Sequence, residues 1–221
     1  GDTTLEFPTT IEYAQRFRQN HPLAIFKTAR NDEQSFYEMA DIIGPPARMM
    51  RWCCSMFKTR PISRVFNSLY RNQSILTYYG IRKRESVSRS KYNRTEDDAE
   101  SVKIQRQKVA SPVFFWSDIE IWLYILGEGI DFNEAYRLGY DRVGCWCCPN
   151  NNARAQFLSK IYMPDQSRRW RDFLVDFATR IGKPDPEVYV DEGWWKARQG
   201  GNGVAASSSV KLKSNQCATE D

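Results

Sequence analysis

Five of the six cysteines in this chain form two short clusters, and this arrangement restricts the chemistry more than any other feature. Cys53 and Cys54 are adjacent, while Cys145, Cys147 and Cys148 lie close together about ninety residues later. The amino terminus does not resemble an export signal, so we expect metal or redox chemistry rather than a disulfide framework. The two residues between Cys145 and Cys148 let both thiolates point at one centre, as in many metal sites.

The adjacent cysteines help to choose the metal. Structural zinc sites usually separate neighbouring cysteine ligands by roughly two to four residues. A cubane cluster presents four irons to four thiolates, so adjacent residues can approach different corners. We therefore predict a [4Fe–4S] cluster on Cys53, Cys54, Cys145 and Cys148, with zinc as the alternative cofactor. The remaining alternatives are that these cysteines are reduced and bind no metal, or that they form a disulfide. Cys147 either replaces Cys145 as a ligand or is a small buried apolar side chain.

Basic residues are concentrated between residues 51 and 94. Eleven Lys or Arg residues in this segment are accompanied by one acidic residue, Glu85, whereas the net charge of the whole chain is only +5. Such an excess suits a polyanionic ligand, either a phosphorylated nucleotide or a nucleic-acid backbone. The alternative is a solvated basic face with no ligand.

Apolar spacing predicts helices alternating with strands, which is typical of an α/β protein with a largely parallel sheet and flanking helices. Residues 23–26 are expected to form a buried strand and residues 74–79 a second one. Residues 82–108 are polar and aperiodic, which indicates a long surface loop. Capping boxes are expected to begin helices at Asn31 and Ser117. The expected helices cover residues 10–20, 31–44, 61–70, 118–126, 153–162 and 165–181.

We expect three regions along the chain. Residues 1–150 would form the α/β domain, residues 151–199 a helical extension, and residues 200–221, rich in Gly, Ser, Ala and Lys, a flexible tail. No apolar run approaches the roughly 20 residues that span a bilayer, so no membrane association is predicted. A cytoplasmic location is the expectation.

Four segments, in order, resemble the iron–sulfur-bearing branch of the adenylyl-sulfate (APS) and phosphoadenylyl-sulfate (PAPS) reductases. Residues 2–8 are similar to the D-T-x-x-x-F-P segment of that family, and residues 51–61 to its double-cysteine segment. Residues 80–89 are similar to G-x-R-x-x-E-S-x-x-R, and residues 112–148 to the stretch that closes in C-x-x-C. The resemblance covers residues 2 to about 150.

This resemblance implies an adenine nucleotide alpha hydrolase-like fold and reduction of APS or PAPS to sulfite by a thioredoxin-like or other thiol donor. It also implies that Lys58, Arg82 and Arg89 bind the sulfate and phosphate groups, and we add Arg51 from the same basic segment. Guanidinium forks and ammonium charges suit oxyanions, which agrees with these roles. The alternative is that some of these arginines only solvate a loop or pair with Glu85.

The chain departs from the family pattern in two places. The S-G-G-K-D-S-like pyrophosphate loop of the family would precede residue 2, so we expect the chain to be part of a longer protein. The family also carries a nucleophilic cysteine in an E-C-G-L-H-like tail segment, and here the tail offers Cys217 without the Gly or the His. Nearby lysines would favour a Cys217 thiolate as the nucleophile, although Cys217 could equally have no role.

Two other functions stay open from the sequence. Relatives with this fold and cysteine pattern transfer sulfur to nucleic acid, as in DNA phosphorothioation or tRNA thiolation, and the basic segment would then follow the nucleic-acid backbone. The second is a non-catalytic, metal-binding nucleic-acid module. The identity of the metal separates this module from the enzymes, and a comparison of nucleotide with DNA binding separates the two enzymes.

Overall fold

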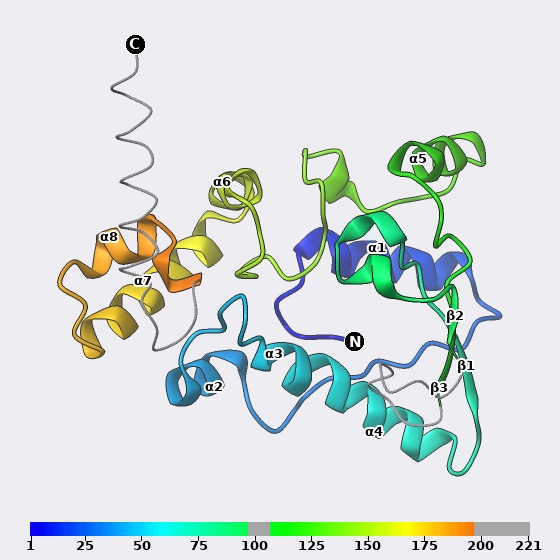
Figure 1. Cartoon of the computed structure of the whole chain (residues 1–221), viewed down its shortest axis with the longest axis horizontal. Coiled ribbons are helices and arrows are strands. Elements are labelled where there is room, and N and C mark those ends of the chain that lie inside the picture. Colours follow the sequence, from blue (N-terminus) through cyan, green and yellow to red (C-terminus); the bar gives the residue numbers. More distant parts are fainter. Residues whose placement is uncertain (97–106, 197–221) are drawn as a thin grey trace.

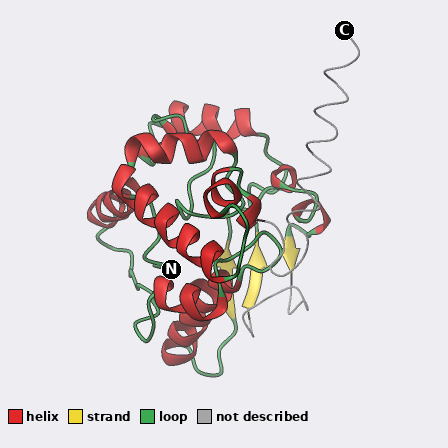
Figure 2. Cartoon of the chain, turned by 90° about the vertical axis from the view of Figure 1, so that its left-hand side faces the viewer, coloured by secondary structure: helices red, strands yellow, loops and turns green. Residues whose placement is uncertain are grey.

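The computed structural model describes residues 1–96 and 107–196, so the tail that contains Cys217 lies outside the described residues. Helices dominate this part of the chain, with a small sheet at the end opposite α7 and α8 (Figures 1 and 2). The helices are α1 Pro8–Asn20, α2 Phe36–Ile43, α3 Trp52–Cys54, α4 Arg60–Leu69, α5 Asp118–Gly127, α6 Ala153–Tyr162, α7 Pro164–Arg180 and α8 Pro186–Asp191. The strands are β1 Ile75–Tyr78, β2 Thr95–Glu96 and β3 Gln107–Ala110.

The fold is of the α/β class, and its sheet is mixed rather than largely parallel. Its strand order is β1-β3-β2, with β1 parallel to β3 and the two-residue β2 antiparallel to β3. The strand predicted at residues 74–79 is confirmed as β1. The segment predicted as a loop at residues 82–108 contains β2 and the first residues of β3. The side chain of the buried Gln107, at the start of β3, donates to Thr77 (2.6 Å) and Tyr79 (3.0 Å). A polar strand of this kind has no apolar alternation to reveal it.

The buried strand predicted at residues 23–26 is wrong. Leu23 is 99% exposed and Ile25 is 85% exposed, in a turn that follows α1. Phe26 instead packs edge-on against Phe17 of α1, with ring centroids 5.9 Å apart. An apolar run of four residues becomes a strand only if a ladder partner is available, and within the described residues none pairs with it.

Capping residues define the starts of two helices. Ser117 and Glu120 form the predicted capping box that begins α5. The capping box of α2 uses Ser35 and Glu38, so this helix begins about four residues later than the Asn31 start that we predicted. The Asn31 side chain instead accepts from the Glu33 N–H, a local bond that favours a turn over a helix. α7 begins with Pro164, and Asp165 lies in its first turn rather than acting as the cap.

An aromatic cluster connects α2 and the start of the cysteine-bearing helix with α7, which is far away in the sequence. Phe36 of α2 stacks on Trp52 at 5.6 Å and contacts Trp170 of α7 at 5.5 Å. Phe57, which is 1% exposed, packs against both Phe36 and Trp52. The start of the cysteine-bearing helix is therefore held by the core. No helix in the described part of the chain is long and apolar enough to cross a membrane.

Candidate active site

The first cysteine pair begins a long helix. α3 continues through a π-helical turn, Ser55–Thr59, into α4 without a break, and Cys53 and Cys54 lie in its first turn, half-buried. The Trp52 indole N–H donates to the Gly44 carbonyl at 3.0 Å, which together with its stacking on Phe36 fixes the helix start. The π turn carries Lys58, and such turns are frequent at functional sites.

The second cysteine pair lies in a compact loop that is bound to the amino-terminal segment. Cys145 forms an isolated antiparallel bridge with Glu6, and the Trp146 N–H donates to the Leu5 carbonyl at 3.0 Å. The Asn151 side-chain amide donates to the carbonyls of Cys145 (3.2 Å) and Trp146 (2.8 Å). These bonds hold the loop that presents Cys145 and Cys148.

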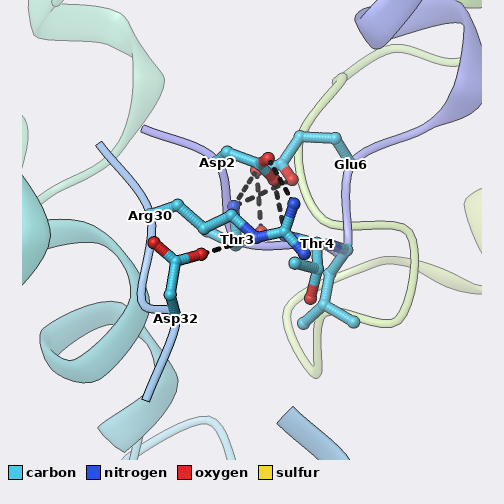
Figure 3. A network of polar contacts seen from close by, with 7 residues as sticks. Asp2, Thr3, Thr4, Glu6, Arg30 and Asp32 are labelled. Atoms are coloured by element: carbon cyan, nitrogen blue, oxygen red, sulfur yellow. Dashed lines mark hydrogen bonds and ion pairs between the residues drawn. The ribbon is translucent and has the colours of Figure 1, made fainter. Parts of the chain in front are cut away.

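The segment 2–6 forms a strained turn beside this loop (Figure 3). Thr4 has a φ of 63°, which is costly for a β-branched residue, and its N–H donates to Asp2 Oδ1 at 2.8 Å. Arg30 approaches Asp2 at 3.6 Å, and the Thr3 hydroxyl donates to Glu6 at 2.7 Å. The same hydroxyl lies 3.6 Å from the Cys145 sulfur, so the turn positions a polar group next to a predicted ligand.

Four of the thiols influence one another. The pKa of Cys53 is raised by its hydrogen bond with Cys54, by burial, and by the negative charges that Cys54, Cys145 and Cys148 would carry. The two cysteine pairs therefore lie within electrostatic reach of each other, while their role as one ligand set stays a prediction.

The cysteines can be compared with the donors that a cluster needs. Among residues 1–96 and 107–196, no three His, Cys, Asp or Glu side chains are grouped as one metal ion would need, so the cofactor stays a prediction. A [4Fe–4S] cluster takes each thiolate on a different iron, so its ligands need not converge on one point. Four half-buried thiols supply the ligand type and number that such a cluster uses.

Cys147 has a different environment from its neighbours. It is 7% exposed and belongs to the hydrophobic core, and burial raises the pKa of its thiol well above the usual value. This placement agrees with the buried apolar alternative. That Cys147 is not a cluster ligand stays a prediction.

One cation acts on a thiol, and three arginines form a second group of charges. The positive charge of Lys58 opposes the rise in pKa that burial causes at Cys145. The pKa of Arg89 is lowered by burial and then by the charges of Arg142 and Arg51. Arg142 and Arg51 therefore each lie within electrostatic reach of Arg89. We had assigned no role to Arg142, although its place three residues before Cys145 was a usable signal.

Two of the predicted anion-binding arginines are paired inside the protein. Arg82 lies 3.5 Å from Glu85 and 2.6 Å from Asp118, and its side chain is only 18% exposed. Arg89 also pairs with Glu85. The alternative of a structural pairing with Glu85 is thus observed for both, and of the two only Arg89 belongs to the group of three arginines.

Comparison with known proteins decides the family. Residues 1–151 match the phosphoadenosine phosphosulfate reductase domain. The chain belongs to this family. The adenosine 5'-phosphosulfate reductase of Neisseria meningitidis serogroup B is 27% identical over 152 residues, which cover 66% of this chain and 58% of that protein. A phosphoadenylyl-sulfate reductase from Candida auris, solved as a phosphate complex, has a TM-score of 0.49 at 20% identity, covering 66% of each chain.

Longer alignments exist with two proteins that carry no assigned function. Two uncharacterized proteins of Methanocaldococcus jannaschii are 29% and 28% identical over 195 and 199 residues, which is 88% and 90% of this chain. The chain spans only 39% and 44% of their lengths. Alignments of this length must include part of the region after residue 151. The predicted family is confirmed, while the iron–sulfur branch and the missing pyrophosphate loop stay predictions.

Proposed function

We propose that this domain reduces adenylyl sulfate or phosphoadenylyl sulfate to sulfite with electrons from thiols. The observation that carries the proposal is that Lys58 lies close enough to Cys145 to influence the pKa of its thiol, while Cys53 is influenced by Cys54, Cys145 and Cys148. Arg51 and Arg142, which precede Cys53 and Cys145 by two and three residues, both influence the pKa of Arg89 and add positive charge. Membership of the reductase family supports the same reaction class.

The cations would bind the anionic part of the substrate. Arg51 and Arg142 are exposed side chains without a carboxylate partner in the part of the chain that the structure describes, so their N–H groups are open to oxyanions. Arg89 pairs with Glu85 but has five N–H donors, so it can bind an oxyanion while it keeps that partner. Lys58 adds a point charge next to Cys145.

The chemistry is a displacement at sulfur. A thiolate, from Cys217 or from a donor protein, attacks the sulfur of the sulfate group, so that an S–S bond forms and the S–O bond to the nucleotide phosphate breaks. The nucleotide leaves with the electron pair, and the cations stabilise the charge that develops on its phosphate. A second thiolate attacks the first thiol sulfur, forms a disulfide and releases sulfite. The two thiols are oxidised and the sulfur is reduced by two electrons.

Cys53, Cys54, Cys145 and Cys148 would hold a [4Fe–4S] cluster, with zinc as the alternative. When bound, the cluster would adjust the electrostatics of the sulfate site rather than pass electrons along the chain. The protein's own part is to keep the four thiols half-buried, to place Lys58 beside them and to hold the loop through Asn151.

The test is anaerobic purification of the chain, followed by metal analysis and assay. Roughly four irons and four sulfides per chain, with sulfite released from adenylyl sulfate by a dithiol, would support the proposal. Lys58→Gln should lower sulfite release, and Arg137→Gln should not, because Arg137 is an exposed arginine paired with Glu134. About one zinc and no sulfide would overturn the cluster. Tight binding of single-stranded DNA or tRNA, without nucleotide binding, would redirect the function to sulfur transfer on nucleic acid.

A further inference from the structure

The helical part of the chain contains a cavity that the proposed reduction does not use. The cavity has a volume of about 390 Å³ and is lined by the loop at residues 146–148, by α6, α7 and α8, and by Trp195. This volume falls within the range of small-molecule sites, which is about 300 to 1,000 Å³. Most of its lining lies after residue 151, where the match to the reductase domain ends.

Three indole rings give the cavity flat apolar walls. Trp146, Trp170 and Trp195 all line it and all are buried in the protein. Trp170 meets Trp195 edge-on, with ring centroids 5.7 Å apart. Walls of this type favour a ligand with a planar apolar body.

The indole N–H of Trp170 is an unsatisfied donor. Trp170 is 6% exposed, and its Nε1 atom is buried without a hydrogen-bond partner in the protein. Buried N–H groups without a partner are rare because desolvating the donor is costly. Because this nitrogen has almost no accessible surface, a ligand in the cavity would contact the indole ring and not this N–H.

The charged residues on the cavity wall favour an anion. Arg171 is held by Asp191 at 2.8 Å and by Glu187 at 3.1 Å, so the one acidic side chain of the lining is already engaged. Arg168 and Lys160 remain as exposed basic residues of the lining. In the described part of the chain, Arg168 has no carboxylate partner.

We propose that this cavity binds a small organic anion with a planar apolar body. The rings of Trp146, Trp170 and Trp195 cover the apolar body of the ligand. Arg168 and Lys160 balance the negative charge. The cavity borders the proposed cysteine site at Cys148, but its lining contains none of the cations assigned to the proposed reduction, and its anion binding does not depend on that function.

The test compares two probes that differ only in charge. The full chain is titrated with 2-naphthoate and with 2-naphthylmethylammonium by isothermal calorimetry at low salt. We expect 2-naphthoate to bind with a dissociation constant of about 1 mM or below, the range for a ligand of this size, and the cation to bind at least about tenfold more weakly. No heat from 2-naphthoate up to about 5 mM, or equal affinity for the two probes, would overturn the proposal.

Three variants locate the binding. Arg168→Gln should weaken 2-naphthoate binding about fivefold or more, and Trp170→Phe should weaken it by a similar factor because the smaller ring leaves less apolar surface on the cavity wall. Arg154→Gln, an exposed arginine of α6 outside the cavity, is the matched control and should bind as the parent does. Thermal melting checks that Trp170→Phe is folded. Unchanged binding in both Arg168→Gln and Trp170→Phe, or a loss of binding in Lys58→Gln, would place the probe elsewhere and refute the site.

Discussion

The role of Arg142 can be tested by Arg142→Gln, which removes the charge and keeps most of the side-chain length. Arg142 is exposed and lowers the pKa of Arg89, so it adds positive charge to a region that already has Arg89 and Arg51. Within the described residues it has no carboxylate partner, unlike Arg89, which pairs with Glu85. Like that of Arg51, the loss of Arg142 should therefore disturb the ligand-free protein little.

The size of the effect follows from these contacts. A hydrogen bond to a charged group is worth about 1.5 to 3 kcal/mol, which corresponds to a loss of roughly 10- to 150-fold in affinity for the nucleotide. The same substitution removes repulsion from Arg89, so the free energy of unfolding should stay within about 0.5 kcal/mol or increase. Weaker binding in a protein that is no less stable is the signature of a ligand-binding charge.

The assay is calorimetric titration with adenosine 5'-monophosphate and with adenylyl sulfate at two salt concentrations. Arg142→Gln should also reduce the dependence of affinity on salt, because fewer ions are displaced. Arg137→Gln, whose arginine pairs with Glu134 at 3.2 Å, is the control for the loss of one positive charge. An affinity within twofold of the parent, or a weakening equal to that of the control, would refute the role of Arg142.

Three further predictions concern the cysteine loop, the core and the carboxyl-terminal end of the described chain. Cys148→Ala should reduce bound iron, whereas Cys147→Ala, at a core position, should leave the iron content unchanged, as measured on anaerobic protein. Phe57→Ala should cost about 3 to 5 kcal/mol in urea unfolding, because the side chain is 1% exposed, whereas Phe57→Leu should cost clearly less. Burial and then Arg48 lower the pKa of Lys196 to about 8, so the unfolded chain holds more protons above that pH and stability should rise with pH between about 8 and 10.4. Lys196→Met should remove this rise in thermal melts, and an identical pH profile would refute it.

Local signals predicted much of the secondary structure. Ser117 and Glu120 form the expected capping box, and the apolar strand at β1 lies where its sequence indicates. The exposed run at residues 23–26 has similar apolar content but no partner within the described residues, so pairing rather than composition decided its state. The start of α2 moved from Asn31 to Ser35 because both residues can cap and only the contacts distinguish them.

The spacing of the cysteines indicated which thiols should lie near one another. Two pairs about ninety residues apart do lie within electrostatic reach of each other, and the shared metal centre stays a prediction. The pairing of Arg82 and Arg89 with Glu85 was one of the alternatives from the sequence, whereas the pairing of Arg82 with Asp118 was not, because Asp118 is distant in sequence. The position of Arg142 before Cys145 was a usable signal, but it does not show that Arg89 lies nearby.

Each cysteine pair has a cation in its own segment, Lys58 four residues after Cys54 and Arg142 three residues before Cys145. The segments that carry the predicted ligands therefore also carry the charges, so the proposed metal binding and the proposed anion binding would share one support. The two kinds of substitution should therefore have different effects on iron binding. Substitution of Lys58 or Arg142 removes only a charge and should leave the iron content intact. Substitution of Cys54 or Cys145 loosens the segment as well and should weaken both iron binding and nucleotide binding.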